Sequence, residues 1–127
     1  MASDGRILRM FAIVSVSMVW LSCSPCEDSL RSKAISGDNR LVASFYERNC
    51  GATTDFVSMV NVQSTSDRFD GEQGTLLSVT GRYNISLEWA GPRKLVITCA
   101  NCARNNIFRQ VIVLGDVDVS YNLPSSR

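Results

Sequence analysis

Apolar and polar side chains alternate strictly over residues 83–89, and this pattern constrains the fold more than any other feature of the chain. The apolar positions are Tyr83, Ile85, Leu87 and Trp89, and between them lie Asn84, Ser86 and Glu88. A period of two places one face of a β-strand in a core and the other face in water. The segment is therefore the clearest predicted strand.

Other segments, between residues 41 and 121, are also predicted to form strands. Alternation recurs over residues 41–45 and 117–121, and residues 94–98 are strand-like. Residues 57–62 and 107–114 are richer in β-branched residues and alternate less, as expected of strands covered on both faces. Turn formers separate these runs: Ser36-Gly37-Asp38-Asn39, Asp70-Gly71, Gly91-Pro92 and Gly115-Asp116. Short strands at this spacing predict an all-β fold, a small antiparallel β-sandwich or an open barrel.

The first residues have the pattern of an export signal. Arg6 and Arg9 precede an apolar run from Met10 to Leu21. A transmembrane helix needs roughly 20 apolar residues, so this run favours a secretory signal over a membrane span. The string before Cys23 resembles a bacterial lipobox, which implies that residues 1–22 are removed as a lipoprotein-type signal peptide and that Cys23 carries lipid. Soluble secretion and an uncleaved anchor are the alternatives.

Residues 23–127 then form a single β-domain, because a chain of this length builds one core. The formal net charge is +1, and the basic residues are spread along the chain, so no electrostatic feature favours nucleic acid as a partner. The predicted location is the bacterial cell envelope, on a lipid-anchored membrane surface that faces the periplasm or the exterior.

The chain has five cysteines, and four remain if Cys23 takes lipid: Cys26, Cys50, Cys99 and Cys102. Four thiols allow three pairings. Cys99 and Cys102 are close enough in sequence to bridge locally, which would leave Cys26 to reach Cys50. A bridge that closes a loop of about 25 residues contributes on the order of 3 kcal/mol in a chain-entropy model, and one that closes a very short loop contributes less.

The Cys99-Ala100-Asn101-Cys102 unit could instead serve redox catalysis or bind a metal. Redox catalysis favours such a unit at the start of a helix, where the dipole lowers the thiol pKa, and here it follows a strand-like run instead. A zinc site would need all four cysteines, because the chain has no histidine. A structural disulfide is favoured over a free or redox-active pair and over metal, and the sequence predicts neither a metal nor a cofactor.

The most distinctive string runs from residue 47 to residue 55 and contains Glu47, Arg48, Cys50, Gly51, Thr53, Thr54 and Asp55. It predicts the end of one strand, a tight connection and the start of the next, with Gly51 supplying backbone freedom and the threonines local hydrogen bonds. Glu47 and Arg48 are expected to form a surface pair or to support the connection. Without histidine, Cys50 lacks the usual base of a cysteine nucleophile, so no catalytic residue is predicted and the chain is not expected to be an enzyme.

With this string the chain resembles a group of uncharacterised small bacterial lipoproteins and exported proteins that carry an E-R-[ND]-C-G-A-T-T segment. The resemblance extends to Cys26, to the turn at residues 36–39 and to the strand at residues 41–46. It implies that Cys26 pairs with Cys50, and it implies a compartment and a fold but no mechanism. Cys99 and Cys102 are not features of that group.

The favoured hypothesis is a noncatalytic, membrane-tethered β-domain that acts on an unknown protein or envelope component. A first alternative is a small exported inhibitor or immunity-like protein that uses the polar interval Ser64 to Gly74, although most such loops are simply solvated. A second is a thiol-disulfide exchange protein that uses Cys99 and Cys102.

Overall fold

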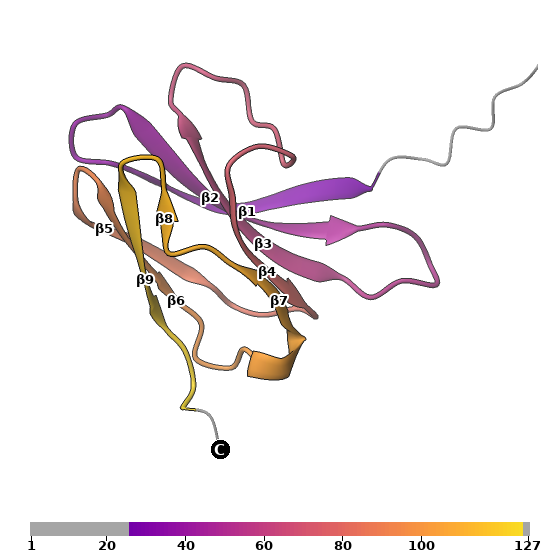
Figure 1. Cartoon of the computed structure of the whole chain (residues 1–127). Helices are drawn as coiled ribbons and strands as arrows, with labels where there is room; N and C mark the ends of the chain where they lie inside the picture. Colours follow the sequence, from indigo (N-terminus) through magenta and orange to yellow (C-terminus); the bar gives the residue numbers. More distant parts are fainter. Residues whose placement is uncertain (1–25, 126–127) are drawn as a thin grey trace, which may run out of the picture.

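A computed structural model describes residues 26–125 and arranges them as two β-sheets packed face to face (Figure 1). The all-β prediction is confirmed, and the architecture is the small sandwich, since neither sheet closes into a barrel. The predicted signal, residues 1–22, and the predicted lipid site Cys23 lie outside the described residues.

The larger sheet has five antiparallel strands in the order β1-β2-β3-β4-β7. Their bounds are β1 (Glu27–Ile35), β2 (Leu41–Asn49), β3 (Val57–Ser64), β4 (Thr75–Thr80) and β7 (Ile107–Gln110). The turn between β1 and β2 falls at the predicted Ser36-to-Asn39 segment, where the Asn39 amide donates to the carbonyl oxygen of Ser36 at 2.9 Å. Asn39 takes a φ of 60° there, a conformation that asparagine tolerates better than most residues.

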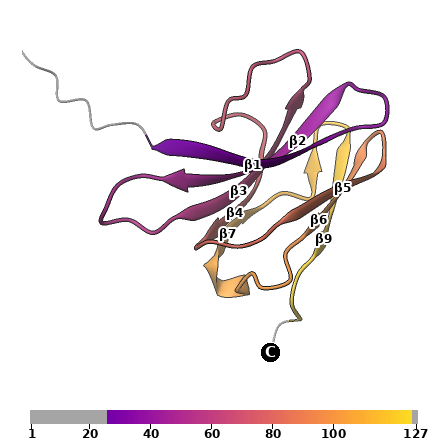
Figure 2. The ribbon, with the colours of Figure 1, turned by 180° about the vertical axis from the view of Figure 1, so that it is seen from behind.

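The smaller sheet has four strands in the order β5-β6-β9-β8. Their bounds are β5 (Ser86–Gly91), β6 (Lys94–Thr98), β8 (Val113–Leu114) and β9 (Val117–Asn122), and a 3₁₀ turn, η1 (Arg104–Asn106), precedes β7. The pairing of β6 with β9 is parallel, and it is the one difference, among the strand pairs described, from a purely antiparallel sandwich. Seen from behind, β1 and β5 approach each other at the side of the sandwich (Figure 2), where the Trp89 indole nitrogen donates to the Ala34 carbonyl oxygen at 2.8 Å.

Alternate residues of both sheets build the core between them. The buried apolar positions include Ala43, Phe45, Val60, Val62, Leu77, Val79, Leu95, Ile97, Val117 and Val119. Fully burying a side chain of the Val, Leu, Ile or Phe type stabilises a fold by about 1.5–3 kcal/mol. The period of two in the sequence therefore translates directly into the packed interface of the sheets.

The connection from β3 to β4, residues 65–74, folds back over the outer face of the larger sheet (Figure 1). Val60, which faces the core, and Asn61, which faces this connection, are both fully buried. The prediction that residues 57–62 are covered on both faces is thus confirmed. The expectation of a simply solvated loop is wrong for part of the connection, because Gly71 within it is buried.

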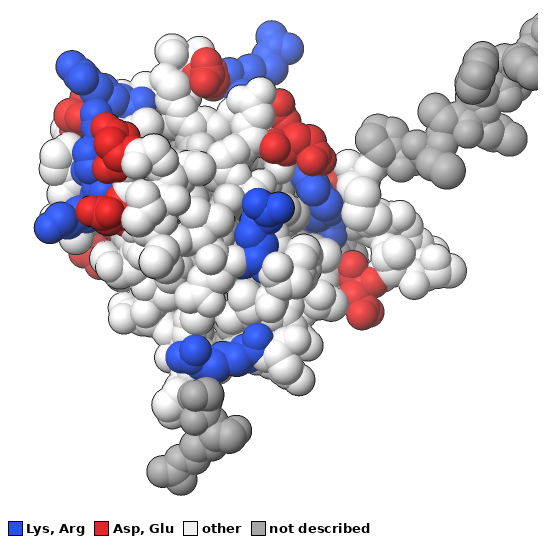
Figure 3. Space-filling view, viewed as in Figure 1, with Lys and Arg blue, Asp and Glu red and all other residues white. Residues whose placement is uncertain are grey.

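The prediction that residues 107–114 form a strand covered on both faces is wrong, since most of β7 is exposed. They form two short strands rather than one, because the chain leaves the larger sheet after β7 and joins the smaller one at β8. At the crossing, the Val111 amide donates to the Leu76 carbonyl oxygen at 2.8 Å and the Ile112 carbonyl accepts from Val119 at 2.9 Å. Phe108 and Ile112 are 64% and 65% exposed, and Figure 3 shows an area without charged side chains over β8 and the chain beside it.

Candidate functional site

The distinctive string at residues 47–55 occupies the end of β2 and the connection to β3, as predicted. Glu47 and Arg48 do not pair with each other, because adjacent residues of a strand point to opposite faces of the sheet. Glu47 accepts from Arg31 at 2.8 Å and lies 3.5 Å from the Arg82 guanidinium. Arg48 points to the outer face instead, so the two residues support different parts of the fold.

Arg48 ties the start of β1 to the connection over the outer face. Its guanidinium donates to both carboxylate oxygens of Asp28, at 2.8 and 3.0 Å, and to the Gly71 carbonyl oxygen at 3.1 Å. Glu72 lies 2.8 Å away. The hydrogen bonds that Arg48 donates to Asp28 raise its already high pKa, against the opposing effect of burial. We call these four residues the Arg48 cluster.

Two disulfides complete the framework. Cys26, just before β1, is bonded to Cys50, just after β2. Cys99 is bonded to Cys102 in the turn after β6, and both are buried in the core. The four cysteines therefore form two separate bridges and do not gather into a zinc-binding set.

The connection after Cys50 is fixed by local hydrogen bonds. Gly51 has a φ of 128°, where a side chain is strained. Its carbonyl oxygen accepts from the Thr54 hydroxyl at 3.0 Å, and its amide donates to the Asn49 side chain at 3.0 Å. Thr53 and Asp55 are exposed on this connection. The string thus folds a turn and supports neighbouring elements.

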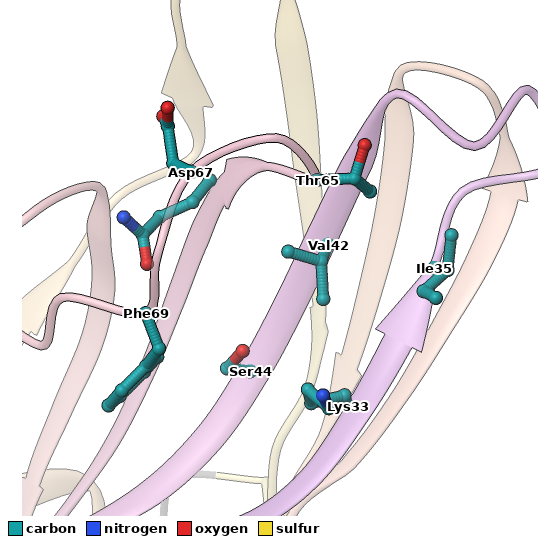
Figure 4. A pocket seen from close by; sticks show the side chains of 8 residues that line it. Lys33, Ile35, Val42, Ser44, Thr65, Asp67 and Phe69 are labelled. Carbon is teal, nitrogen blue, oxygen red and sulfur yellow. The ribbon is translucent and has the colours of Figure 1, made fainter.

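A groove on the outer face of the larger sheet is the candidate functional site (Figure 4). It has a volume of about 160 Å³ and is lined by Lys33, Ile35, Val42, Ser44, Gln63, Thr65, Asp67 and Phe69. The first four come from β1 and β2, and the last three from the connection 65–74. We call this feature the outer groove.

Apolar side chains that line the outer groove are exposed to water. Ile35 is 57% exposed and Phe69 37% exposed. Ile35 lies opposite Val42 in the register of β1 and β2, so the two form an apolar floor. Lys33 and Asp67 bring one charge of each sign to the lining. An apolar floor with a few polar groups around it is typical of binding sites.

The wall that Phe69 forms is held in place from below. The Tyr46 hydroxyl donates to the Gly71 carbonyl oxygen at 2.7 Å, and the Tyr46 ring meets Phe69 edge to face with centroids 5.2 Å apart. The Asn61 amide donates to the carbonyl oxygens of Asp70 and Gln73, each at 3.0 Å. Burial raises the pKa of Tyr46 to about 12, so its hydroxyl keeps the proton that it donates. The groove is therefore preformed.

The outer groove was not predicted from the sequence, because Ile35, Val42 and Phe69 are far apart in the chain. The only signal was the polar interval Ser64 to Gly74, which supplies its wall. No protein-family model, curated protein or solved structure matches this chain. The resemblance to small bacterial lipoproteins therefore stays a prediction.

Within residues 26–125, no three side chains of the His, Cys, Asp or Glu type come together as a possible metal site. The same part of the chain contains no helix of the length and apolar character required to cross a membrane.

Proposed function

We propose that this chain is a noncatalytic, membrane-tethered binding domain of the bacterial cell envelope, and that its outer groove receives an apolar side chain of a partner protein. The observation that carries the proposal is the exposure of Ile35 and Phe69 around a preformed groove. Leaving such side chains in water forgoes the stabilisation of burial. A partner that covers them recovers it.

The size of the outer groove favours a single side chain over a larger ligand. Its volume is about 160 Å³, and a cavity of about 150 Å³ accommodates a molecule as small as benzene. The flanking charges also favour a protein. Lys33 and Asp67 offer one cation and one anion, which suits polar groups of both signs beside an apolar anchor, as at protein interfaces.

The tether is the second part of the proposal. Arg6, Arg9, the apolar run and Cys23 support it. A single acyl chain gives only marginal membrane binding, whereas two or three chains on one cysteine anchor a domain stably. A tethered domain would meet its partner within the envelope, where even a small contact surface benefits from a high local concentration.

An inhibitor or immunity-like role is the second candidate, and it uses the same surface. Thr65, Asp67 and Phe69 are exposed and line the outer groove, so this connection would contact an enzyme partner first. Deleting residues 65–68 should then abolish inhibition, whereas a partner that is not an enzyme would show no change in activity on binding.

Thiol-disulfide exchange receives less support. Cys99 and Cys102 are 0% and 1% exposed, and exchange requires an attacking thiolate to reach a sulfur. The buried position favours a structural bridge.

The test is site-specific photo-cross-linking in intact bacteria that express the chain with its own signal. A photoreactive amino acid replaces Ile35 in one strain and Ile112 in a matched control, since these residues are 57% and 65% exposed. We expect one discrete adduct at position 35, mapped to a partner peptide next to an apolar residue, and none at position 112. The added substitution Val42→Asp should abolish the adduct.

Equal adducts at positions 35 and 112, or an adduct that survives Val42→Asp, would contradict a role for the outer groove. The tether is tested separately: Cys23→Ala should release the protein from the membrane fraction and remove the acyl mass. Retention of Cys23→Ala in the membrane would contradict lipid anchoring.

A further inference from the structure

One end of the sandwich is fixed close to the predicted lipid. Only Ser24 and Pro25 separate Cys23 from Cys26, and three residue steps span at most about 11 Å. Cys26 is bonded to Cys50, so the start of β1 cannot peel away from β2 to lengthen this link. The bridge therefore sets the length of the tether.

We call this the disulfide end, formed by Cys26, residues 50–56 and residues 81–82. These segments contact each other: the Gly81 amide donates to the Phe56 carbonyl oxygen at 2.7 Å, and the Arg82 guanidinium carbon lies 3.6 Å from the Phe56 ring centre. Cys50 to Asp55 are exposed. The disulfide end thus offers a continuous surface next to the point of attachment.

The opposite end, which we call the turn end, gathers three turns (Figure 1), at residues 36–40, 91–93 and 115–116. Arg93 joins them, with its guanidinium 3.1 Å from Asp38 and 3.1 Å from Asp116. Figure 3 shows basic and acidic side chains together over these turns. β1 has nine residues, so at about 3.3 Å per residue it separates the two ends by roughly 25–30 Å.

We propose that the disulfide end faces the phospholipid headgroups and that the turn end projects away from the bilayer. The proposal rests on the proposed lipid on Cys23. Because the strands run away from the point of attachment and the bridge limits the tether to two residues, the domain stands on the membrane at the disulfide end. The Ile35 side of the outer groove, at the far end of β1, then lies away from the bilayer, where a partner can reach it.

Tryptophan fluorescence tests this orientation in the full-length lipoprotein. Removal of residues 1–22 takes Trp20 with it, which leaves Trp89 as the tryptophan of the mature chain. Trp89 lies near the turn end, because its indole contacts Ala34. The protein, purified from bacteria with its acyl chains, is placed in phosphatidylethanolamine and phosphatidylglycerol vesicles that carry brominated acyl chains, which quench tryptophans near the bilayer.

We expect almost no quenching of Trp89 and severalfold stronger quenching of a tryptophan at the disulfide end. That probe is Phe56→Trp in a Trp89→Phe background. Thr53→Trp in the same background is the second probe, since Thr53 is exposed and its replacement leaves the packing intact. In a Cys26→Ser, Cys50→Ser variant with Trp89 retained, Trp89 quenching should rise, because the longer link lets the domain tilt.

Equal quenching at the two ends would overturn the proposal, since it means that the domain lies flat. Stronger quenching of Trp89 would overturn it too. A purified protein without acyl mass on Cys23 and without vesicle binding would overturn both this orientation and the proposed tether, whereas acylated, vesicle-bound protein with equal quenching removes the orientation alone.

Discussion

The two ends of the sandwich are stabilised by different kinds of interaction. The disulfide end has a covalent bridge, and next to it lies the ion pair of Arg48 with Asp28, whose side chains are only 15% and 17% exposed. At the turn end, Arg93 and Asp38 are about twice as exposed, and Asp116 is 80% exposed. The ion pairs near both ends join an arginine to an aspartate, so a comparison of these pairs isolates the effect of burial. It indicates that stability is concentrated where the chain would be anchored.

The largest effect is expected from removing the bridge between Cys26 and Cys50. The double variant Cys26→Ser, Cys50→Ser should lower the free energy of unfolding by about 3 kcal/mol, because the unfolded chain regains the entropy of a long loop. Urea unfolding measures this. The control is Cys99→Ala, Cys102→Ala, which opens a much shorter loop. A greater loss in the control would contradict the chain-entropy account.

Arg48→Met tests the polar half of the same end. The variant leaves the Asp28 carboxylate without its guanidinium partner, whereas the Gly71 carbonyl oxygen keeps the hydrogen bond from the Tyr46 hydroxyl. Leaving a partly buried charged group unpaired costs about 2 kcal/mol. A double-mutant cycle with Asp28→Asn should recover part of this loss, since the unpaired charge is removed as well. If Arg48→Met is as mild as a surface substitution, the Arg48 cluster does not stabilise the disulfide end.

The core and several turns could be predicted from the sequence because they obey local rules. Leu41, Ala43 and Phe45 alternate, and all three face the core of the folded chain. β1 was missed because it is an edge strand with most of its side chains in water, so no apolar pattern marks it. Its pairing with β2 depends on backbone hydrogen bonds, which side-chain periodicity does not report.

The candidate site was beyond prediction for a related reason. The connection 65–74 reads as polar and solvated, yet its backbone carbonyls at Asp70, Gly71 and Gln73 accept hydrogen bonds from Tyr46 and Asn61. Carbonyls are present in every residue and carry no signature in the sequence. The fold-back that creates the outer groove is therefore visible only in three dimensions.

Raising the pH above 10 should destabilise the outer face, where Tyr46 lies, and β9, which contains Tyr121. The expected loss of stability lies between that of Arg48→Met and that of Arg93→Ala. Burial raises the pKa of Tyr46 and of Tyr121 to about 12, whereas an unfolded tyrosine loses its proton near pH 10. A folded-state pKa above the unfolded value gives stability that is complete below pH 10 and is lost as the pH rises through 12. Urea midpoints between pH 9 and pH 12 should fall.

Tyr46→Phe is the matched variant for the alkaline experiment. It removes the titrating hydroxyl next to the Arg48 cluster, so its urea midpoint should depend less on pH above 10 than that of the unaltered chain. It should also be less stable at neutral pH, because the Gly71 carbonyl oxygen loses the 2.7 Å hydrogen bond. An unchanged slope with pH would show that Tyr46 titrates as in the unfolded chain.

Arg93→Ala should have the smallest effect on the free energy of unfolding, a small fraction of that of Arg48→Met, because exposed ion pairs contribute little in water.

The effect of Arg93→Ala should also vanish in acid. A hydrogen bond from Ser36 and the neighbouring Arg93 hold the pKa of Asp38 below its ordinary value of 3.8. A depressed carboxyl pKa gives stability that is present above the unfolded value and is lost as the pH falls through the folded one. Urea midpoints of the two proteins should therefore converge below pH 3.8 and in high salt, which screens the exposed charges. A loss from Arg93→Ala as large as that from Arg48→Met would mean that burial does not separate the two ends, and the comparison between them would fail.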